Sequence, residues 1–245
     1  ILGYSLPDLC KNGPEAHLGQ TQYTQPALYL VSYLHARSIS SESEIPAMAA
    51  GHSVGEFAAL AYSEAVTFAD GLKMVAKRGE IMSQVSGGGM AAVIALDIEK
   101  IQEVFSRNGF EGIDLANFNS PGQIVISGPG DQVSQSLSPL KEAGAKLVVP
   151  LKVSGAFHSR MMEGPALQFG QFLKSFSFQK TTFPVYANVT AAPYPDASSI
   201  PETLVRQIHS PVLWAETILE MRSSGADDFQ ECGPGKVLTK LLRQI

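Results

Sequence analysis

Apolar residues recur at helical spacing in two segments, residues 24–37 and residues 70–85, and both are therefore predicted to be helices. The positions that set this spacing are Ala27, Leu28, Val31 and Leu34 in the first segment and Leu72, Val75, Ala76 and Gly79 in the second. Between them, a serine-rich polar connection leads into a short apolar run at residues 45–50, and a helical run follows at residues 56–61. This order predicts a strand that turns directly into a helix.

The pattern changes at the three glycines of residues 87–89, which indicate a hinge or a domain boundary. In the stretch that follows, the predicted strands are residues 90–96, 113–118, 123–127 and 146–151, and the predicted helices are residues 98–107 and 131–143. Pro139 is a candidate interruption of the second helix, and Asn-Ser-Pro-Gly at residues 119–122 is a strong turn signal. The order β-α-β-β-α-β is the ferredoxin-like pattern, so we place an inserted small subdomain at residues 88–152.

Helical and strand patterns alternate again after residue 152. The predicted helices are residues 161–176, 203–209 and 213–223 and a final helix from residue 236, and the predicted strands are residues 184–188 and 228–231. This alternation around a strand–helix turn favours a parallel-sheet α/β core. The predicted fold class is an α/β-hydrolase-like large subdomain, residues 1–87 and 153–245, with the ferredoxin-like small subdomain inserted into it.

Composition limits the classes of function. The chain has 245 residues, of which 44% are hydrophobic, enough for a substantial core. Its formal net charge of −5 gives no basic excess to meet a phosphate backbone, so we expect no nucleic-acid partner. The two cysteines, Cys10 and Cys232, form no metal-type pair, and no apolar run reaches transmembrane length. We therefore expect no metal, no membrane association and a reduced, cytoplasmic setting.

The sequence Gly-His-Ser-Val-Gly at residues 51–55 fits G-x-S-x-G, the pattern of a nucleophile elbow. In this motif the serine lies on a strained turn between a strand and a helix, and its hydroxyl projects beside the positive end of the helix. The predicted strand before the motif and the predicted helix after it supply that context. The alternative is a glycine-bounded loop with an incidental serine, and the flanking elements favour Ser53 as a nucleophile.

A serine hydroxyl needs a base at neutral pH, and the chain has five histidines. His17 and His35 lie in surface-like contexts, and His209 lies at a predicted helix end, where a histidine often meets free carbonyls. His52 lies inside the elbow, where it could shape the turn or line the cleft. His158 follows a predicted strand at the return from the small subdomain, and that position can bring it over the elbow.

The acidic third member of a triad is harder to find. A hydrolase triad runs serine, acid, histidine along the chain, so only residues 56–142 could supply an acid before His158. No acidic residue there stands in a distinctive motif, and neither do Asp196, Asp227 or Asp228. A Ser–His dyad, in which a carbonyl group orients the imidazole, is therefore an alternative to a triad.

Arg78 is the other unusual residue, because it shares a helical stripe with Met74 and Met82 at i±4 spacing. In one interpretation the side chain runs along the apolar surface and keeps its charged head in water. In the other, the guanidinium is buried and awaits a carboxylate, which its fork geometry would bind through two hydrogen bonds. The pattern alone leaves both open.

Together these features resemble the malonyl-CoA:acyl-carrier-protein transacylase family, which includes the acyltransferases of polyketide synthases. The resemblance spans essentially the whole chain and rests on seven motifs in order. These are Thr-Gln-Pro-Ala-Leu at 24–28, Ala-Gly-His-Ser-Val-Gly-Glu at 50–56, Lys-Arg-Gly at 77–79, Asn-Phe-Asn-Ser-Pro-Gly-Gln at 117–123, Val-Ser-Gly-Ala-Phe-His-Ser at 153–159, Gln-Ile-His-Ser-Pro-Val at 207–212 and Gly-Pro-Gly-Lys-Val-Leu at 233–238.

The resemblance implies a role for each matching residue. It implies that Ser53 carries the acyl group, that His158 is its general base and that Arg78 pairs with the free carboxylate of malonate. It further implies that Gln25 lines the acyl pocket and that the main-chain carbonyl of Gln207 orients the histidine, so that no acid is needed.

Three further residues complete the expected substrate site. The resemblance implies that the backbone N–H of Val54 is one oxyanion donor and that Phe157 is the bulky residue that favours malonyl over methylmalonyl groups. His52 is grouped with them as a residue of the cleft. The family pattern normally begins with a strand and a Gly-Gln-Gly-Ser-Gln segment that gives the second oxyanion donor. This chain starts after that point, so we expect the N-terminal strand and the oxyanion segment to be missing from it.

The function that the resemblance implies is transfer of a malonyl group from malonyl-CoA to the phosphopantetheine thiol of an acyl carrier protein, with no permanently bound cofactor. One alternative is an acyl hydrolase that clears carrier proteins with the same Ser–His pair, and a buried Arg78 would disfavour it. Another is a non-catalytic scaffold that docks carrier proteins. We expect a monomer or a domain of a larger synthase, in a fatty acid or a polyketide pathway.

Overall fold

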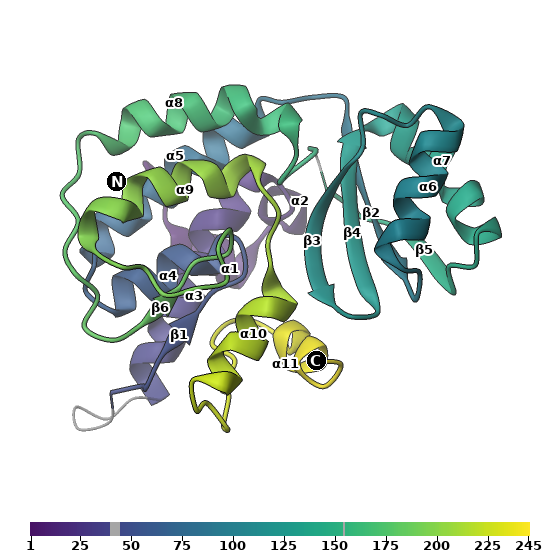
Figure 1. Ribbon diagram of the computed structural model, residues 1–245. Helices are drawn as coiled ribbons and strands as arrows, with labels where there is room; N and C mark the ends of the chain where they lie inside the picture. The colour runs from purple at the N-terminus through teal and green to yellow at the C-terminus, as the bar shows by residue number, and fades with distance from the viewer. Residues whose placement is uncertain (40–44, 154) are drawn as a thin grey trace.

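The computed structural model describes residues 1–39, 45–153 and 155–245. Most of the predicted serine-rich connection and Ser154 of the histidine motif therefore lie outside the described residues. Figure 1 shows two parts side by side, a larger helical part and a smaller part built on a sheet. The chain leaves the larger part before β2, builds the smaller part, and returns after β5.

The larger part surrounds two short parallel strands, β1 (Ala49–Ala50) and β6 (Val185–Tyr186), which pair in register. The helices around them are α3 (Thr21–Ile39), α4 (Gly55–Tyr62), α5 (Phe68–Ser83), α8 (Glu163–Leu173) and α9 (Ile200–His209). Their apolar faces form one core that includes Tyr29, Phe57, Met74 and Phe169. The parallel pairing confirms the predicted α/β class with a parallel sheet.

The smaller part contains β2 (Gly88–Ile94), α6 (Ile98–Asn108), β3 (Asp114–Ser120), β4 (Gln123–Pro129), α7 (Gly130–Glu142) and β5 (Leu147–Pro150). The strands form one sheet in the order β3-β4-β2-β5, and all neighbours are antiparallel. Helices α6 and α7 cover one face of it (Figure 1). Pro139 lies inside α7 without ending it.

The edge strand β3 joins the smaller part to the larger one. Val212, just before α10 (Trp214–Ser223), accepts a hydrogen bond from Phe118 N–H at 2.9 Å and donates one to the carbonyl of Ala116 at 2.9 Å. Arg160 adds an ion pair to Asp114 at 2.6 Å. These contacts cover an edge that would otherwise present unpaired backbone groups, and they fix the two parts against each other beside the elbow.

The structure differs from the sequence-based prediction near both ends of the chain. Residues 228–231 are not a strand and pair with neither sheet, and the side chain of Glu231 accepts hydrogen bonds from the backbone N–H groups of Leu238 and Thr239 at the start of α11 (Val237–Leu242). Helices α1 (Leu6–Asn12) and α2 (Glu15–Leu18) were not predicted, since both are too short to show a helical period. The short helical turns η1 (Arg160–Met162) and η2 (Ala197–Ser199) lead into α8 and α9.

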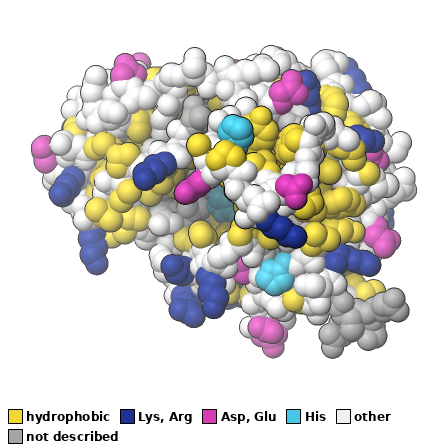
Figure 2. Space-filling model, turned by 180° about the vertical axis from the view of Figure 1, so that it is seen from behind, with side chains coloured by type: hydrophobic (Ala, Val, Ile, Leu, Met, Phe, Trp, Pro, Cys, Tyr) yellow, Lys and Arg dark blue, Asp and Glu magenta, His cyan; other side chains and the backbone are white. Residues whose placement is uncertain are grey.

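None of the described helices is long and apolar enough to cross a membrane. On the face opposite to that of Figure 1, acidic and basic side chains are spread among hydrophobic ones (Figure 2).

Candidate active site

Ser53 lies on the turn between β1 and α4 and has a positive φ of 52°. Such a left-handed backbone is uncommon for residues other than glycine, and it costs conformational energy. The turn is so tight that a Cβ atom on Gly51 would lie 2.0 Å from the carbonyl carbon of Gly55. A Cβ on Gly55 would meet nothing within 4 Å. The two glycines of the motif therefore have different roles, and Gly51 is the one that the turn requires.

The imidazole of His158 reaches Ser53 from a segment 105 residues further along the chain. Its Nε2 atom lies 2.8 Å from Oγ of Ser53, and its Nδ1 atom lies 2.8 Å from the main-chain oxygen of Gln207. Because a carbonyl oxygen only accepts, Nδ1 carries the proton and Nε2 is free to accept the serine O–H. The partner of Nδ1 is a main-chain carbonyl group, so the pair has the geometry of a dyad.

His158 is buried, with 4% of its surface exposed. Burial, together with the smaller effect of the positive charge of Arg78, lowers the pKa of His158 to about 3. The imidazole is therefore neutral at physiological pH and available as a base.

Arg78, on α5, has 1% of its surface exposed. Its Nη1 atom donates to Oε1 of Gln25 at 2.8 Å, and its Nη2 atom donates to Oε1 of Gln207 at 3.0 Å and to Oγ of Ser53 at 3.2 Å. The interpretation that the head lies in water is therefore wrong. Burial lowers the pKa of Arg78 to about 10, opposed by the charge of Glu56, so the guanidinium stays charged at neutral pH.

Among the described residues, the buried Nε–H of Arg78 has no hydrogen-bond partner. Buried donors in native proteins are almost always satisfied, so an exception at a site is informative. The same guanidinium lies 5.7 Å from the centre of the Phe57 ring. The site thus contains a fixed cation whose Nη2 atom lies beside the serine and whose Nε–H has no partner among the described residues.

Sequence reasoning missed Glu56, Asn188 and Tyr194, which lie directly behind the serine. Glu56 has no exposed surface. It accepts hydrogen bonds from the backbone N–H of Asn188 at 3.1 Å, from Nε2 of Gln207 at 2.7 Å and from the hydroxyl of Tyr194. Burial raises the pKa of Glu56 to about 7 against the effect of these donors. A glutamate inside the apolar run of α4 was the one signal in the sequence that could have revealed it.

The remaining predicted site residues lie around this centre. Gln25 contacts Arg78, and it also lies 3.5 Å from the sulfur of Met82. Val54 is buried at the N-terminal end of α4, where helical N–H groups lack partners within the helix. Phe157 is half-buried between the cores of the two parts. His52 points the other way, with Nε2 2.9 Å from Oδ1 of Asn119 at the end of β3, and burial lowers its pKa.

The other histidines lie elsewhere. His17 stacks on Tyr23 at 5.5 Å between ring centres, and His35 accepts the backbone N–H of Gly233 at 3.1 Å. His209 lines a hollow of about 510 Å³ together with His158, Phe118 and Arg160. Within the described residues, no three His, Cys, Asp or Glu side chains group into a set that could hold a metal ion.

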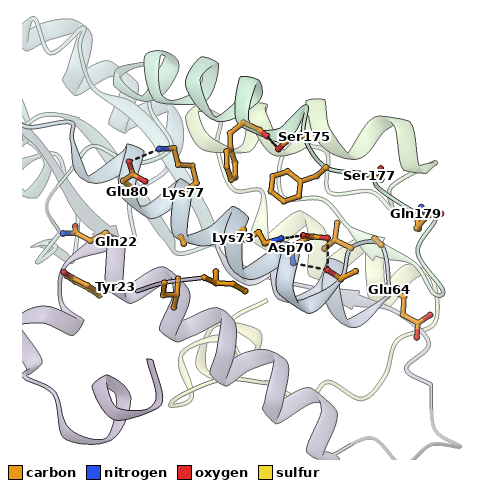
Figure 3. A pocket seen from close by; sticks show the side chains of 18 of the residues that line it. Gln22, Tyr23, Glu64, Asp70, Lys73, Lys77, Glu80, Ser175, Ser177 and Gln179 are labelled. Atoms are coloured by element: carbon orange, nitrogen blue, oxygen red, sulfur yellow. Dashed lines mark hydrogen bonds and ion pairs between the residues drawn. The ribbon is translucent and has the colours of Figure 1, made fainter. Parts of the chain in front are cut away.

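A larger hollow of about 970 Å³ lies along α5, on the side of this helix that faces away from Ser53 (Figure 3). Lys73 pairs with Asp70 and Lys77 pairs with Glu80 along its wall, each at 2.8 Å. Neither Ser53 nor His158 lines it. Of these two hollows only the smaller one is lined by His158, and Ser53 lines neither.

Comparison with protein families matches the Acyl transferase domain model to residues 1–245, the whole chain. The chain is 46% identical to the polyketide biosynthesis protein ThaF of Burkholderia thailandensis, and the match covers 100% of this chain and 21% of ThaF. It is 43% identical to the polyketide biosynthesis malonyl CoA-acyl carrier protein transacylase PksC of Bacillus subtilis, over 100% of this chain and 85% of PksC. The chain thus spans about a fifth of one relative and most of the other.

A solved complex, PlMCAT:AntF (holo), is described as a type II PKS acyl-carrier protein with its malonyl-transacylase. The matched chain of this complex superposes on the present structure with a TM-score of 0.95 and is 36% identical to it, over 99% of this chain and 80% of the matched chain.

Proposed function

Since the chain belongs to the acyl transferase domain family, whose model matches residues 1–245, we propose that it transfers a malonyl group from malonyl-CoA to the phosphopantetheine thiol of an acyl carrier protein. One observation carries the proposal. Oγ of Ser53 lies 2.8 Å from Nε2 of His158 and 3.2 Å from Nη2 of Arg78, so a serine with its base lies beside a buried cation. A hydrolase for neutral acyl groups has no use for that cation.

In the first half-reaction, His158 removes the proton of Ser53 while Oγ attacks the thioester carbon of malonyl-CoA. The tetrahedral oxyanion faces the backbone N–H of Val54 at the start of α4, where the helix dipole also favours negative charge. The carbon–sulfur bond then breaks, and His158 returns the proton to the sulfur of CoA. Malonyl-Ser53 and free CoA thiol remain.

In the second half-reaction, the phosphopantetheine thiol gives its proton to His158 and attacks the malonyl ester. The ester bond to Ser53 breaks, and His158 protonates Oγ. The main-chain carbonyl of Gln207 holds Nδ1–H of the imidazole through both halves. It therefore keeps the tautomer that leaves Nε2 free.

Arg78 selects the acyl group. Its guanidinium binds the free carboxylate of malonate with charge-assisted hydrogen bonds, which are about twice as strong as neutral ones. Gln25 and Gln207 hold it from two sides, so little ordering cost remains when the carboxylate binds. An acetyl group makes no such contact.

Phe157 and His52 shape the rest of the cleft. Phe157 precedes the base and fills space on the side of the smaller part, which disfavours an acyl group with an extra methyl. His52 is hydrogen-bonded to Asn119 and packs against Trp214 at 5.4 Å between ring centres. It thereby ties the elbow to the end of β3.

We also propose that the chain consists of two subdomains. Residues 1–87 and 153–245 form the large subdomain and residues 88–152 the small one, whose order β3-β4-β2-β5 supports the ferredoxin-like description. The carrier-protein partner is supported by the transacylase of the PlMCAT:AntF complex. The cytoplasmic setting and the monomeric or synthase-bound state stay predictions.

Intact-mass measurement tests the proposal. The protein is mixed in turn with malonyl-, methylmalonyl- and acetyl-CoA, and the expected result is a malonyl adduct that Ser53→Ala abolishes and that transfers to a carrier protein. Free malonate as the main product would instead identify a hydrolase. Absence of any adduct on the wild-type serine would identify a non-catalytic carrier-docking domain.

A further inference from the structure

Glu56 is a buried carboxyl group that takes no part in the reaction described above. It lies three residues after Ser53 in the first turn of α4 and is completely buried. A buried charge is costly unless hydrogen bonds compensate for it. All three partners of Glu56, the N–H of Asn188, Nε2 of Gln207 and the hydroxyl of Tyr194, can donate to it. These donors offset part of the cost of burial, and at pH 8, above its pKa of about 7, Glu56 is an ionised carboxylate.

The orientation of the Gln207 amide follows from its neighbours. Arg78 can only donate, so Oε1 must face the guanidinium, where it lies 3.0 Å from Nη2. The carbonyl of Ser53 can only accept, so Nε2 must face it, at 2.9 Å. The second hydrogen of Nε2 goes to Glu56 at 2.7 Å. The carboxylate thus fixes the amide that holds Arg78.

Asn188 provides a second connection from Glu56 to the elbow. Its backbone N–H donates to Glu56, while its side chain accepts the N–H of Ser53 at 2.7 Å and donates to the carbonyl of Gly51 at 2.7 Å. Glu56 therefore contacts both residues that hold the backbone of the nucleophile. This backbone is strained at Ser53, and a strained turn persists only where its surroundings hold it.

We propose that Glu56 is a positioning residue, which aligns Arg78 with Ser53 through the amide of Gln207; this inference rests on the function proposed above. Its carboxylate touches no reacting atom. Preference for acyl groups with a free carboxylate depends on Glu56, because a loosened Gln207 no longer keeps Nη2 of Arg78 beside Oγ of Ser53.

Four variants separate this role from general stabilisation. Glu56→Gln can still accept from Asn188 and Gln207 through its oxygen and can donate to the oxygen of Tyr194, so it keeps the hydrogen bonds without the charge. Glu56→Ala removes them all. Gln207→Ala keeps the main-chain carbonyl that orients His158 but cuts the link to Arg78. Ser136→Ala, on α7 of the smaller part, removes a buried hydrogen bond far from the site and is the matched control.

The measurement is kcat/KM for acylation of Ser53 by malonyl-CoA and by acetyl-CoA on the same preparation at pH 8. The ratio of the two values does not depend on the folded fraction, so loss of stability alone cannot change it. We expect Glu56→Ala and Gln207→Ala each to lower the ratio about tenfold or more, the value of one hydrogen bond to a charged group. Glu56→Gln and Ser136→Ala should stay near the wild-type ratio.

An unchanged ratio in Glu56→Ala would overturn the inference. If Glu56→Ala does not fold, an unchanged ratio in Gln207→Ala would overturn it. A fall of the ratio in Glu56→Gln as large as the fall in Gln207→Ala would also overturn it, because the hydrogen bonds would then not be the cause. If the wild-type protein forms no malonyl adduct on Ser53, the proposed function fails first and the inference fails with it.

Discussion

The Nδ1 atom of His158 lies 2.8 Å from the main-chain oxygen of Gln207, so a backbone carbonyl orients the imidazole. A backbone acceptor cannot be removed by a side-chain substitution, and it carries no charge of its own. The imidazole therefore keeps its orientation without the electrostatic support that a carboxylate gives to an imidazolium. Glu56, the only buried acidic side chain among the described residues, instead accepts a hydrogen bond from the side chain of Gln207.

The two glycines of the elbow should respond differently to substitution. Gly51→Ala would place its Cβ 2.0 Å from the carbonyl carbon of Gly55, and we expect a loss of about 3 kcal/mol or more in the free energy of unfolding. Gly55→Ala has open space and begins a helix, so it should cost nothing. Urea unfolding of the two variants measures both values. Equal losses would contradict the assignment of the tight contact to Gly51.

Removal of Arg78 should change the choice of acyl group. We expect Arg78→Ala to lower kcat/KM for malonyl-CoA by about 10²-fold, the value of two charge-assisted hydrogen bonds, with a much smaller effect on acetyl-CoA. Arg78→Lys should restore only part of the preference, because an ammonium group lacks the planar fork. Arg107→Ala, an exposed arginine of α6, is the control. A parallel fall for both acyl groups would argue against carboxylate recognition by Arg78.

The value of kcat/KM for acylation should not fall near pH 6.5, where an ordinary histidine would become protonated. Because burial lowers the pKa of His158 to about 3, the imidazole remains a free base as the pH falls from 7.5 to 5. An unperturbed histidine would lose its base form below about pH 6.5. The measurement is kcat/KM for malonyl-CoA, which reports the free enzyme. The measurement is repeated in Glu56→Gln, which removes any contribution from titration of Glu56. A fall of kcat/KM near pH 6.5 in that variant would contradict the expectation.

Titration of Glu56 should make stability fall as the pH rises. Its pKa is about 7 in the folded protein against an ordinary 4.5, so the folded state holds the proton more tightly. The resulting stabilisation is complete below pH 4.5 and is lost as the pH rises through 7. We expect the unfolding free energy of the wild type, relative to Glu56→Gln, to fall by about 3 kcal/mol over that range. Denaturant titrations at several pH values measure it, and a constant difference would show that the folded pKa is not raised.

Much of the fold was predictable where the signal is local. The helices with clear apolar spacing, the succession of strands and helices along the smaller part and the turn at residues 119–122 follow from the pattern of side chains. The prediction was wrong at residues 228–231, because a short segment forms a strand only where a neighbouring strand pairs with it, and neither sheet reaches this segment. Short helices such as α2 have no period to detect.

The sequence by itself predicted the elbow, because G-x-S-x-G between a strand and a helix is a local pattern of five adjacent residues. It also identified His158 and Arg78 as candidates, but it left open what they contact. Only the tertiary structure decided that Arg78 is buried, that a carbonyl orients His158, and that Glu56 and Asn188 support the serine. These contacts join residues such as Ser53 and Asn188, which are 135 positions apart, and no local pattern encodes a partner at that distance. Their geometry comes from the packing of α4, α5 and α9 around β1 and β6.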